Sequence, residues 1–175
     1  MSEAAANRII KLSSSDGTVL TISRKAIRHA ETANRSIENA NADAAADSEN
    51  PPIEGSIPMS NVDTWTLQKI ITWCEHHAND PIPTVHPIEP RNITISPWDA
   101  EFLNVDHEAL YKIIMAANYM EVTGLLEIAC KTIANMMEGL TTVQLRSEFG
   151  ITHDFTDAEL AQIERENAWC DGDDY

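Results

Sequence analysis

The sequence predicts an α+β protein in which a small sheet packs with helices and a helical extension follows at the C-terminal end. Three observations indicate this class: a hairpin pattern within the first 25 residues, a helical repeat of apolar residues after residue 60, and a succession of helix start signals from residue 96 onward. With 175 residues, 43% of them hydrophobic, the chain is long enough to bury one core.

Two short apolar runs near the N-terminus predict a β-hairpin. The runs Ile9–Leu12 and Val19–Ile22 are separated by a polar stretch that contains Asp16-Gly17. Asp-Gly between β-type runs favours a tight turn, because glycine readily adopts the positive φ that such a turn needs. Further along, Ile57-Pro58-Met59 fits a third, short strand at a sheet edge, where the missing N–H of proline breaks no ladder.

Two helices are expected beside this sheet. The first runs from Arg24 to about Ala33, and the second begins at a capping box formed by Ser60 and Asp63. In the second helix, apolar side chains recur at the spacing i, i+3, i+4, i+7: Leu67, Ile70, Ile71 and Cys74. This face is expected to lie in the core.

Two segments are predicted to be loops. Residues 34–56 are rich in Ala, Asn, Asp, Glu and Pro, and they offer too little apolar surface to offset the cost of ordering. We interpret them as a solvated acidic linker. Residues 79–97 contain five prolines, which stop helix formation and favour an extended loop.

The remainder of the chain reads as a run of short helices. Five start signals occur within about 65 residues, and each can satisfy the N–H groups of a first helical turn: Ser96-Pro97 with Asp99, Asp106, Thr123, Thr141 with Gln144, and Thr156 with Glu159. Gly139 and Gly150 are placed to end helices.

The charge of the chain restricts its partners. It contains 28 acidic and 12 basic residues, for a formal charge of −16. Nucleic acids and anionic membranes bind proteins through Lys and Arg, so both are poor candidate partners. The three cysteines, Cys74, Cys130 and Cys170, are widely separated, which is typical of free thiols in a reducing compartment. Without a signal peptide or an apolar run of about 20 residues, the protein is expected in the cytoplasm and nucleus.

Few residues suggest catalysis. Cys74, His76 and His77 have zinc-ligand chemistry, but a closed site needs four ligands and no second pair stands at a suitable spacing. Alternatively, Cys74 packs inward while the histidines favour the C-terminal end of the helix. The sequence contains no nucleophile motif and no glycine-rich phosphate loop, so we expect neither an enzyme nor a bound cofactor.

The apolar residues near the C-terminus offer a surface for partners. Ile133, Met136 and Met137 follow a helical stripe, and methionine is common where a surface adapts to varied ligands. Further large apolar groups lie in short helices: Leu145, Phe149, Ile151, Phe155, Trp169 and Cys170. These residues are either core or a binding surface, and Trp169 favours the surface because little of the chain remains to cover it.

Several motifs in one order resemble a known family. They are S-S-D-G at 14–17, Trp73-Cys74 with His76-His77, W-D-A-E-F-L at 98–103, A-A-N-Y-M-E-V-T-G-L-L-E-I-A-C-K-T-I-A-N-M at 116–136, D-F-T at 154–156 and R-E-N-A-W-C at 165–170. Together they resemble the S-phase kinase-associated adaptors of SCF ubiquitin ligases, which have a BTB/POZ-type fold.

The resemblance implies a bridging role in ubiquitin-dependent protein degradation. It implies a BTB/POZ-like cullin-binding domain at 7–138 and a helical extension at 139–175 that, with the preceding helix, binds F-box proteins. By motif, Asn118 and Tyr119 would contact the cullin scaffold. The F-box contacts would be Ile133, Met137, Leu145, Phe149, Ile151, Trp169 and Cys170.

Two other classes stay open from the sequence. One is a self-associating BTB-type structural protein outside any ligase, because the same apolar surface could close a homodimer. The other is a metal enzyme centred on Cys74, His76 and His77. We also expect the free protein to self-associate weakly, against the repulsion of eight acidic residues in 154–175.

Overall fold

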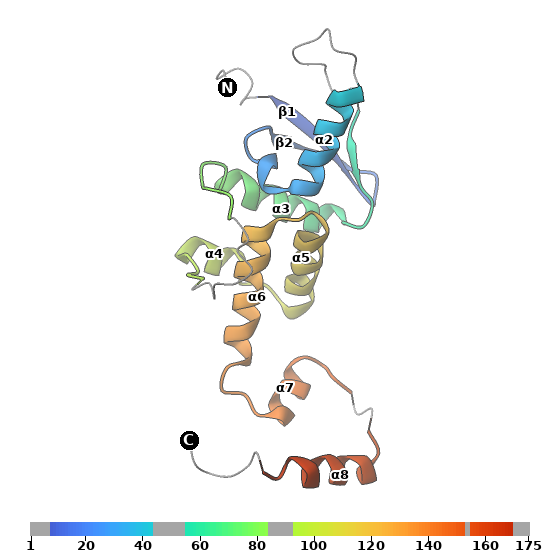
Figure 1. Ribbon diagram of the computed structural model, residues 1–175, viewed down its shortest axis with the longest axis vertical. Coiled ribbons are helices and arrows are strands. Elements are labelled where there is room, and N and C mark those ends of the chain that lie inside the picture. The colour runs from blue at the N-terminus through green and yellow to red at the C-terminus, as the bar shows by residue number, and fades with distance from the viewer. Residues whose placement is uncertain (1–7, 44–54, 84–92, 153–154, 170–175) are drawn as a thin grey trace. The chain divides into compact units, whose positions relative to one another are not determined.

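A computed structural model describes residues 8–43, 55–83, 93–152 and 155–169 (Figure 1). The chain divides into two compact units, Met1–Met136 and Met137–Tyr175, which we call unit 1 and unit 2. The sequence-based boundary lay between residues 138 and 139. The sheet belongs to unit 1, and the α+β class is confirmed.

The sheet has three strands in the order β2-β1-β3. Strands β1 (Ile9–Ser14) and β2 (Val19–Ser23) are antiparallel, and Gly17 in their turn has a φ of +79°. Strand β3 (Ile57–Met59) runs parallel to β1 at the opposite edge. Both the hairpin and the edge strand with Pro58 are therefore confirmed.

The first helical region differs from the prediction. The structure has a single turn of 3₁₀ helix, η1 (Ile27–His29), and then the helix α2 (Glu31–Asp43). The expected helix from Arg24 to about Ala33 is wrong in position, and the predicted linker is wrong for residues 34–43. Ala33 and Ile37 lie one turn apart on α2 and are both buried, so tertiary packing orders a segment that its polar composition assigned to solvent. Residues 44–54 lie outside the described part.

Helix α3 (Thr64–His76) begins three residues later than the Ser60 capping box implied. Asp63 is its N-cap and accepts a hydrogen bond from the Thr66 N–H at 2.9 Å. Asp16 of the hairpin turn accepts a further bond from the Thr64 N–H at 2.8 Å. The predicted inward face of α3 is confirmed, because all four of its apolar residues are buried: Leu67, Ile70, Ile71 and Cys74.

Three helices complete unit 1. They are α4 (Pro97–Phe102), capped by Ser96, α5 (His107–Tyr119), capped by Asp106, and α6 (Thr123–Met137). Buried Asp99 of α4 accepts a hydrogen bond from the Trp73 ring N–H at 2.9 Å and ties α4 to α3. Helix α3 packs on α5 and on β2, and side chains of these elements belong to one hydrophobic core.

Unit 2 consists of α7 (Thr142–Glu148) and α8 (Asp157–Asn167). Thr141 with Gln144, and Thr156 with Glu159, form the predicted capping boxes. Gly139 and Gly150 have positive φ angles of +77° and +61°, as expected of residues that end helices. Neither α7 nor α8 has a buried residue, so this unit contributes nothing to the core that the structure describes.

Candidate functional site

One face of α5 carries large side chains that nothing in the described chain covers. Tyr111, Met115 and Asn118 follow the spacing i, i+4, i+7, and Tyr111 and Met115 are 60% and 50% exposed. The opposite face of the same helix is buried and includes Leu110 and Ile113. Since two faces of one helix are apolar but only one lies in the core, the other is available to a partner.

This face borders a depression of about 450 Å³. It is lined by residues of α5, of the segment just before α3 and of the first turn of α3: Asn61, Val62, Asp63, Thr66, Tyr111, Lys112, Met115, Ala116, Asn118 and Tyr119. Asn118 is exposed and Tyr119 is half-buried. The structure therefore brings the two residues of the A-A-N-Y motif together with Tyr111 and Met115, and we call these four residues the α5 surface.

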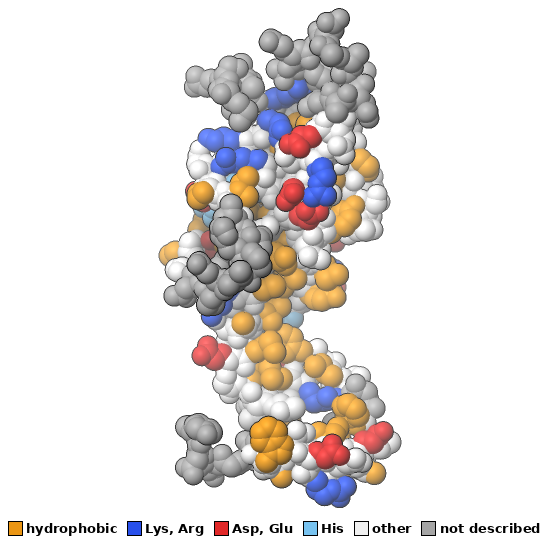
Figure 2. Space-filling model, viewed as in Figure 1, with side chains coloured by type: hydrophobic (Ala, Val, Ile, Leu, Met, Phe, Trp, Pro, Cys, Tyr) orange, Lys and Arg blue, Asp and Glu red, His pale blue; other side chains and the backbone are white. Residues whose placement is uncertain are grey.

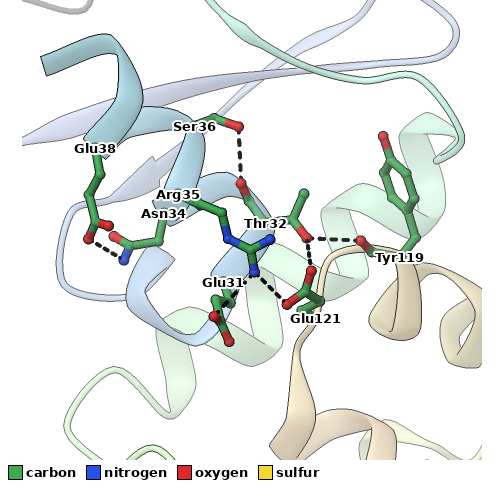
Figure 3. A network of polar contacts seen from close by, with 8 residues as sticks. All are labelled: Glu31, Thr32, Asn34, Arg35, Ser36, Glu38, Tyr119 and Glu121. Carbon is green, nitrogen blue, oxygen red and sulfur yellow. Dashed lines mark hydrogen bonds and ion pairs between the residues drawn. The ribbon is translucent and has the colours of Figure 1, made fainter. Parts of the chain in front are cut away.

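A polar network fixes the end of α5 (Figure 3). The Thr32 hydroxyl of α2 donates to the Tyr119 carbonyl oxygen at 3.1 Å, and it also lies 3.2 Å from Glu121 Oε1. Arg35 pairs with Glu31 at 3.2 Å and with Glu121 at 2.8 Å, and these carboxylates raise the pKa of its guanidinium. Glu121 has a φ of +56°, in a region that non-glycine residues rarely occupy. The contacts from α2 thus hold the strained turn that follows Tyr119.

The predicted C-terminal residues differ in exposure. On α6, Ile133 and Met136 are half-buried against the core of unit 1, whereas Met137 is 42% exposed. In unit 2, Leu145 and Phe149 are half-buried, Ile151 is exposed, and Trp169 is 79% exposed. Cys170 lies outside the described residues. Of the residues that the sequence left as either core or binding surface, Ile133 and Met136 pack against the core, whereas Trp169 lies on the surface.

Unit 2 leaves most of its large apolar side chains accessible, as the orange groups on this part of Figure 2 show. We call the following residues the C-terminal surface: Leu145, Phe149, Ile151, Phe155, Leu160, Ile163 and Trp169. An internal contact supports the arrangement, because the Arg146 guanidinium lies 5.8 Å from the Phe155 ring centre and donates to the Thr152 carbonyl at 3.0 Å. Such an accessible apolar set in so small a unit is typical of a binding site.

The positions of Cys74, His76 and His77 do not fit a zinc site. Cys74 is fully buried, and burial raises the pKa of its thiol to about 12, whereas zinc binds the thiolate. His76 stacks on Trp98 with 3.7 Å between ring centres, and His77 lies within hydrogen-bond distance of Asp80 and Asp99, at 2.6 and 3.1 Å. In the part of the chain that the structure describes, no group of three or more His, Cys, Asp or Glu residues could hold a metal ion.

The longest of the described helices, α6, has 15 residues. None of them combines the length and the apolar character that crossing a bilayer requires.

Sequence comparison places the chain among known proteins. Residues 8–79 match the Skp1 family tetramerisation domain, and residues 123–170 match the Skp1 family dimerisation domain. The chain is 43% identical over 173 residues to a Skp1-related protein of Caenorhabditis elegans, covering 98% of this chain and 96% of that protein. It is 42% identical over 174 residues to the E3 ubiquitin ligase complex SCF subunit sconC of Arthroderma benhamiae, covering 98% and 99%. The corresponding protein of Arthroderma otae is 41% identical over 173 residues.

Proposed function

Because the chain belongs to the Skp1 family, we propose that it is the adaptor subunit of an SCF-type ubiquitin ligase, which links a cullin scaffold to F-box substrate receptors. In this role it binds partners and carries out no chemical step. Relatives described as E3 ubiquitin ligase complex SCF subunits match almost the whole of this chain, which supports the assignment.

The observation that carries the proposal is the presence of two accessible surfaces in different units. The α5 surface belongs to unit 1, whereas the C-terminal surface belongs to unit 2. An adaptor needs two binding surfaces that can be occupied at the same time, and residues from separate folding units meet this need better than one shared site. Within this proposal, residues 7–138 form the cullin-binding domain and 139–175 the helical extension.

The α5 surface is the proposed cullin contact. Asn118 and Tyr119 come from the family motif, and the structure adds Tyr111 and Met115 because they line the same depression. Tyrosine presents an apolar ring with one polar end, which makes it a frequent anchor of interfaces. Helical packing of the partner against this face would bury two side chains that are now at least half exposed.

The F-box contact is proposed to include residues of α6 and of the C-terminal surface. The set is Ile133, Met137, Leu145, Phe149, Ile151, Trp169 and Cys170. Its support is the exposure of Met137, Ile151 and Trp169 and the absence of any buried residue in α7 and α8. A partner helix would supply the apolar contacts that unit 2 lacks by itself.

The cullin assignment is tested by changing Asn118 and Tyr119 together to alanine. Loss of a central anchor should weaken cullin binding by about 2 kcal/mol or more. Titration calorimetry with a cullin measures this change, and circular dichroism checks that the fold is retained. Trp169→Ala is the matched control, because it removes an exposed aromatic residue from the other surface. Unchanged cullin affinity in the folded double variant would refute the assignment.

Weak self-association of the free protein is proposed through the same C-terminal surface. Association with a second copy of the chain would bury the exposed apolar residues, whereas repulsion between the acidic residues of 154–175 in the two copies opposes it. Salt should therefore tighten the dimer, since it screens charge over about 10 Å at 0.1 M. Sedimentation at several concentrations, with and without an F-box peptide, tests this. A dimer that persists when the peptide saturates the protein would show that the two do not share a surface.

A further inference from the structure

Helix α8 separates its apolar residues from its single cation. With about 100° between successive residues, Leu160 and Ile163 form one stripe along the helix. Leu160 is half-buried, and Ile163 is 38% exposed. Glu164 and Glu166 border this stripe on either side, whereas Arg165 falls on the opposite face. Glu159, near the start of the helix, lies on the same side as Glu166.

No cation among the described residues balances these carboxylates. Glu159 accepts hydrogen bonds from the backbone and hydroxyl of Thr156, both at 2.7 Å, which lower the pKa of its side chain. Glu166 accepts from the Gln162 side chain at 2.8 Å, and all three glutamates are exposed. The other arginine of unit 2, Arg146, is held by the Thr152 carbonyl and the Phe155 ring. The apolar stripe of α8 therefore has an anionic border.

We propose that the occupant of the C-terminal surface is an amphipathic helix whose apolar stripe is bordered by Lys or Arg, and that Glu164 and Glu166 select for this charge. The inference rests on the proposed function, in which this helix is the F-box segment of a substrate receptor. It goes further by assigning a charge class to that segment. Receptors with basic flanks then bind in preference to those with neutral or acidic flanks.

Charge complementarity favours this occupant over a second copy of the chain. A second copy brings the same three glutamates to the contact, and like charges placed opposite each other oppose association. A basic helix instead forms attractive pairs at the border while its apolar stripe meets Leu160 and Ile163. The two occupants therefore respond to salt in opposite directions, because screening weakens the attraction in one case and the repulsion in the other.

The test uses the full chain and two synthetic F-box peptides with the same apolar residues. One peptide carries Lys and Arg at its flanks, and the other carries Glu at the same positions. Fluorescence anisotropy measures the Kd of each at about 0.05 M and about 0.5 M NaCl, conditions that differ severalfold in screening length. The protein variants are the double change Glu164→Gln with Glu166→Gln, and Arg165→Gln as the control on the opposite face.

The proposal expects the basic peptide to bind more tightly at low salt and to lose that advantage at high salt. The double variant should raise its Kd at low salt by about fivefold, the scale of two exposed ion pairs, while Arg165→Gln should not raise it. Equal Kd values for both peptides, or a double variant without effect at low salt, would overturn the inference and leave the proposed function intact. Absence of binding by either peptide at every salt concentration would overturn both.

Discussion

Unit 1 and unit 2 differ in where their apolar residues lie. In unit 1, three strands, η1 and four helices share a core of fully buried side chains such as Leu12, Leu67 and Ile113. In unit 2, α7 and α8 have well-formed caps but no buried residue. Local signals are therefore sufficient to shape helices, while the stability of a unit depends on what its side chains pack against. Unit 2 forms capped helices, but its apolar side chains are as exposed as those of a binding surface without its partner.

The largest expected effect is on the stability of unit 1. Leu67→Ala on α3 removes a fully buried side chain and should lower the free energy of unfolding by about 2 to 5 kcal/mol. Ile163→Ala on α8 is the matched change in unit 2, where a surface substitution should alter the stability of the free protein by less than about 0.5 kcal/mol. Urea denaturation measures both. Similar losses for the two variants would show that unit 2 belongs to the cooperative core.

Hydrogen exchange should show the same contrast without any substitution. Amides of α3 and α5 are expected to exchange through global unfolding, whereas those of α7 and α8 should exchange through local opening, because few buried contacts hold them. Adding the basic F-box peptide should slow exchange in α7, in α8 and at the C-terminal end of α6, which carries Ile133 and Met137, and should leave α3 and α5 unchanged. Mass-spectrometric detection resolves the two regions, and strong protection of α8 in the free protein would contradict the comparison.

A smaller effect is expected at the N-cap of α3. Asp63→Ala should cost about 1 kcal/mol at neutral pH. Hydrogen bonds from the Thr66 backbone lower the pKa of Asp63 below its ordinary value of 3.8, so its contribution is fully present above pH 3.8 and is lost as the pH falls through the lowered value. Denaturation at neutral and strongly acidic pH tests this. The difference between wild type and variant should shrink in acid, and a constant difference would mean that the ionised carboxylate is not responsible.

The smallest effect concerns His29, which is 5% exposed in unit 1. Burial lowers the pKa of its imidazole below 6.5, so the unfolded chain takes up a proton before the folded one. Its contribution to stability is present above pH 6.5 and is lost as the pH falls from there through the lowered value. His29→Asn should make the stability of the protein less dependent on pH in this range. A pH profile unchanged in shape would assign that dependence to other groups.

Sequence signals located best the features that depend on neighbouring residues. Ser96, Asp106, Thr141 and Thr156 are helix caps as predicted, because a cap satisfies N–H groups only two or three residues away. The predicted capping box at Ser60 is wrong, because Asp63 is the N-cap of α3. Asp16, which is distant in the sequence, accepts a hydrogen bond from the Thr64 N–H. That contact spans 48 positions, so no local pattern contains it.

The position of α2 and the full extent of the α5 surface needed the fold. Ala33 and Ile37 are a weak apolar pattern, and only the core that they contact makes α2 stable. Tyr111 and Met115 went unnoticed because apolar side chains on a helix usually face the core. The missed signal was the presence of a second stripe, Leu110 with Ile113, on the other face of α5.

The most direct test of the adaptor role is an affinity pull-down from cells, read by mass spectrometry, with three forms of the protein. The unmodified chain should recover a cullin and F-box proteins together. The Asn118→Ala, Tyr119→Ala double variant should lose the cullin and keep the F-box proteins, while a chain ending at residue 155 should lose the F-box proteins and keep the cullin. Loss of both partners from either variant, or recovery of neither partner by the unmodified chain, would contradict the account of two separate binding surfaces.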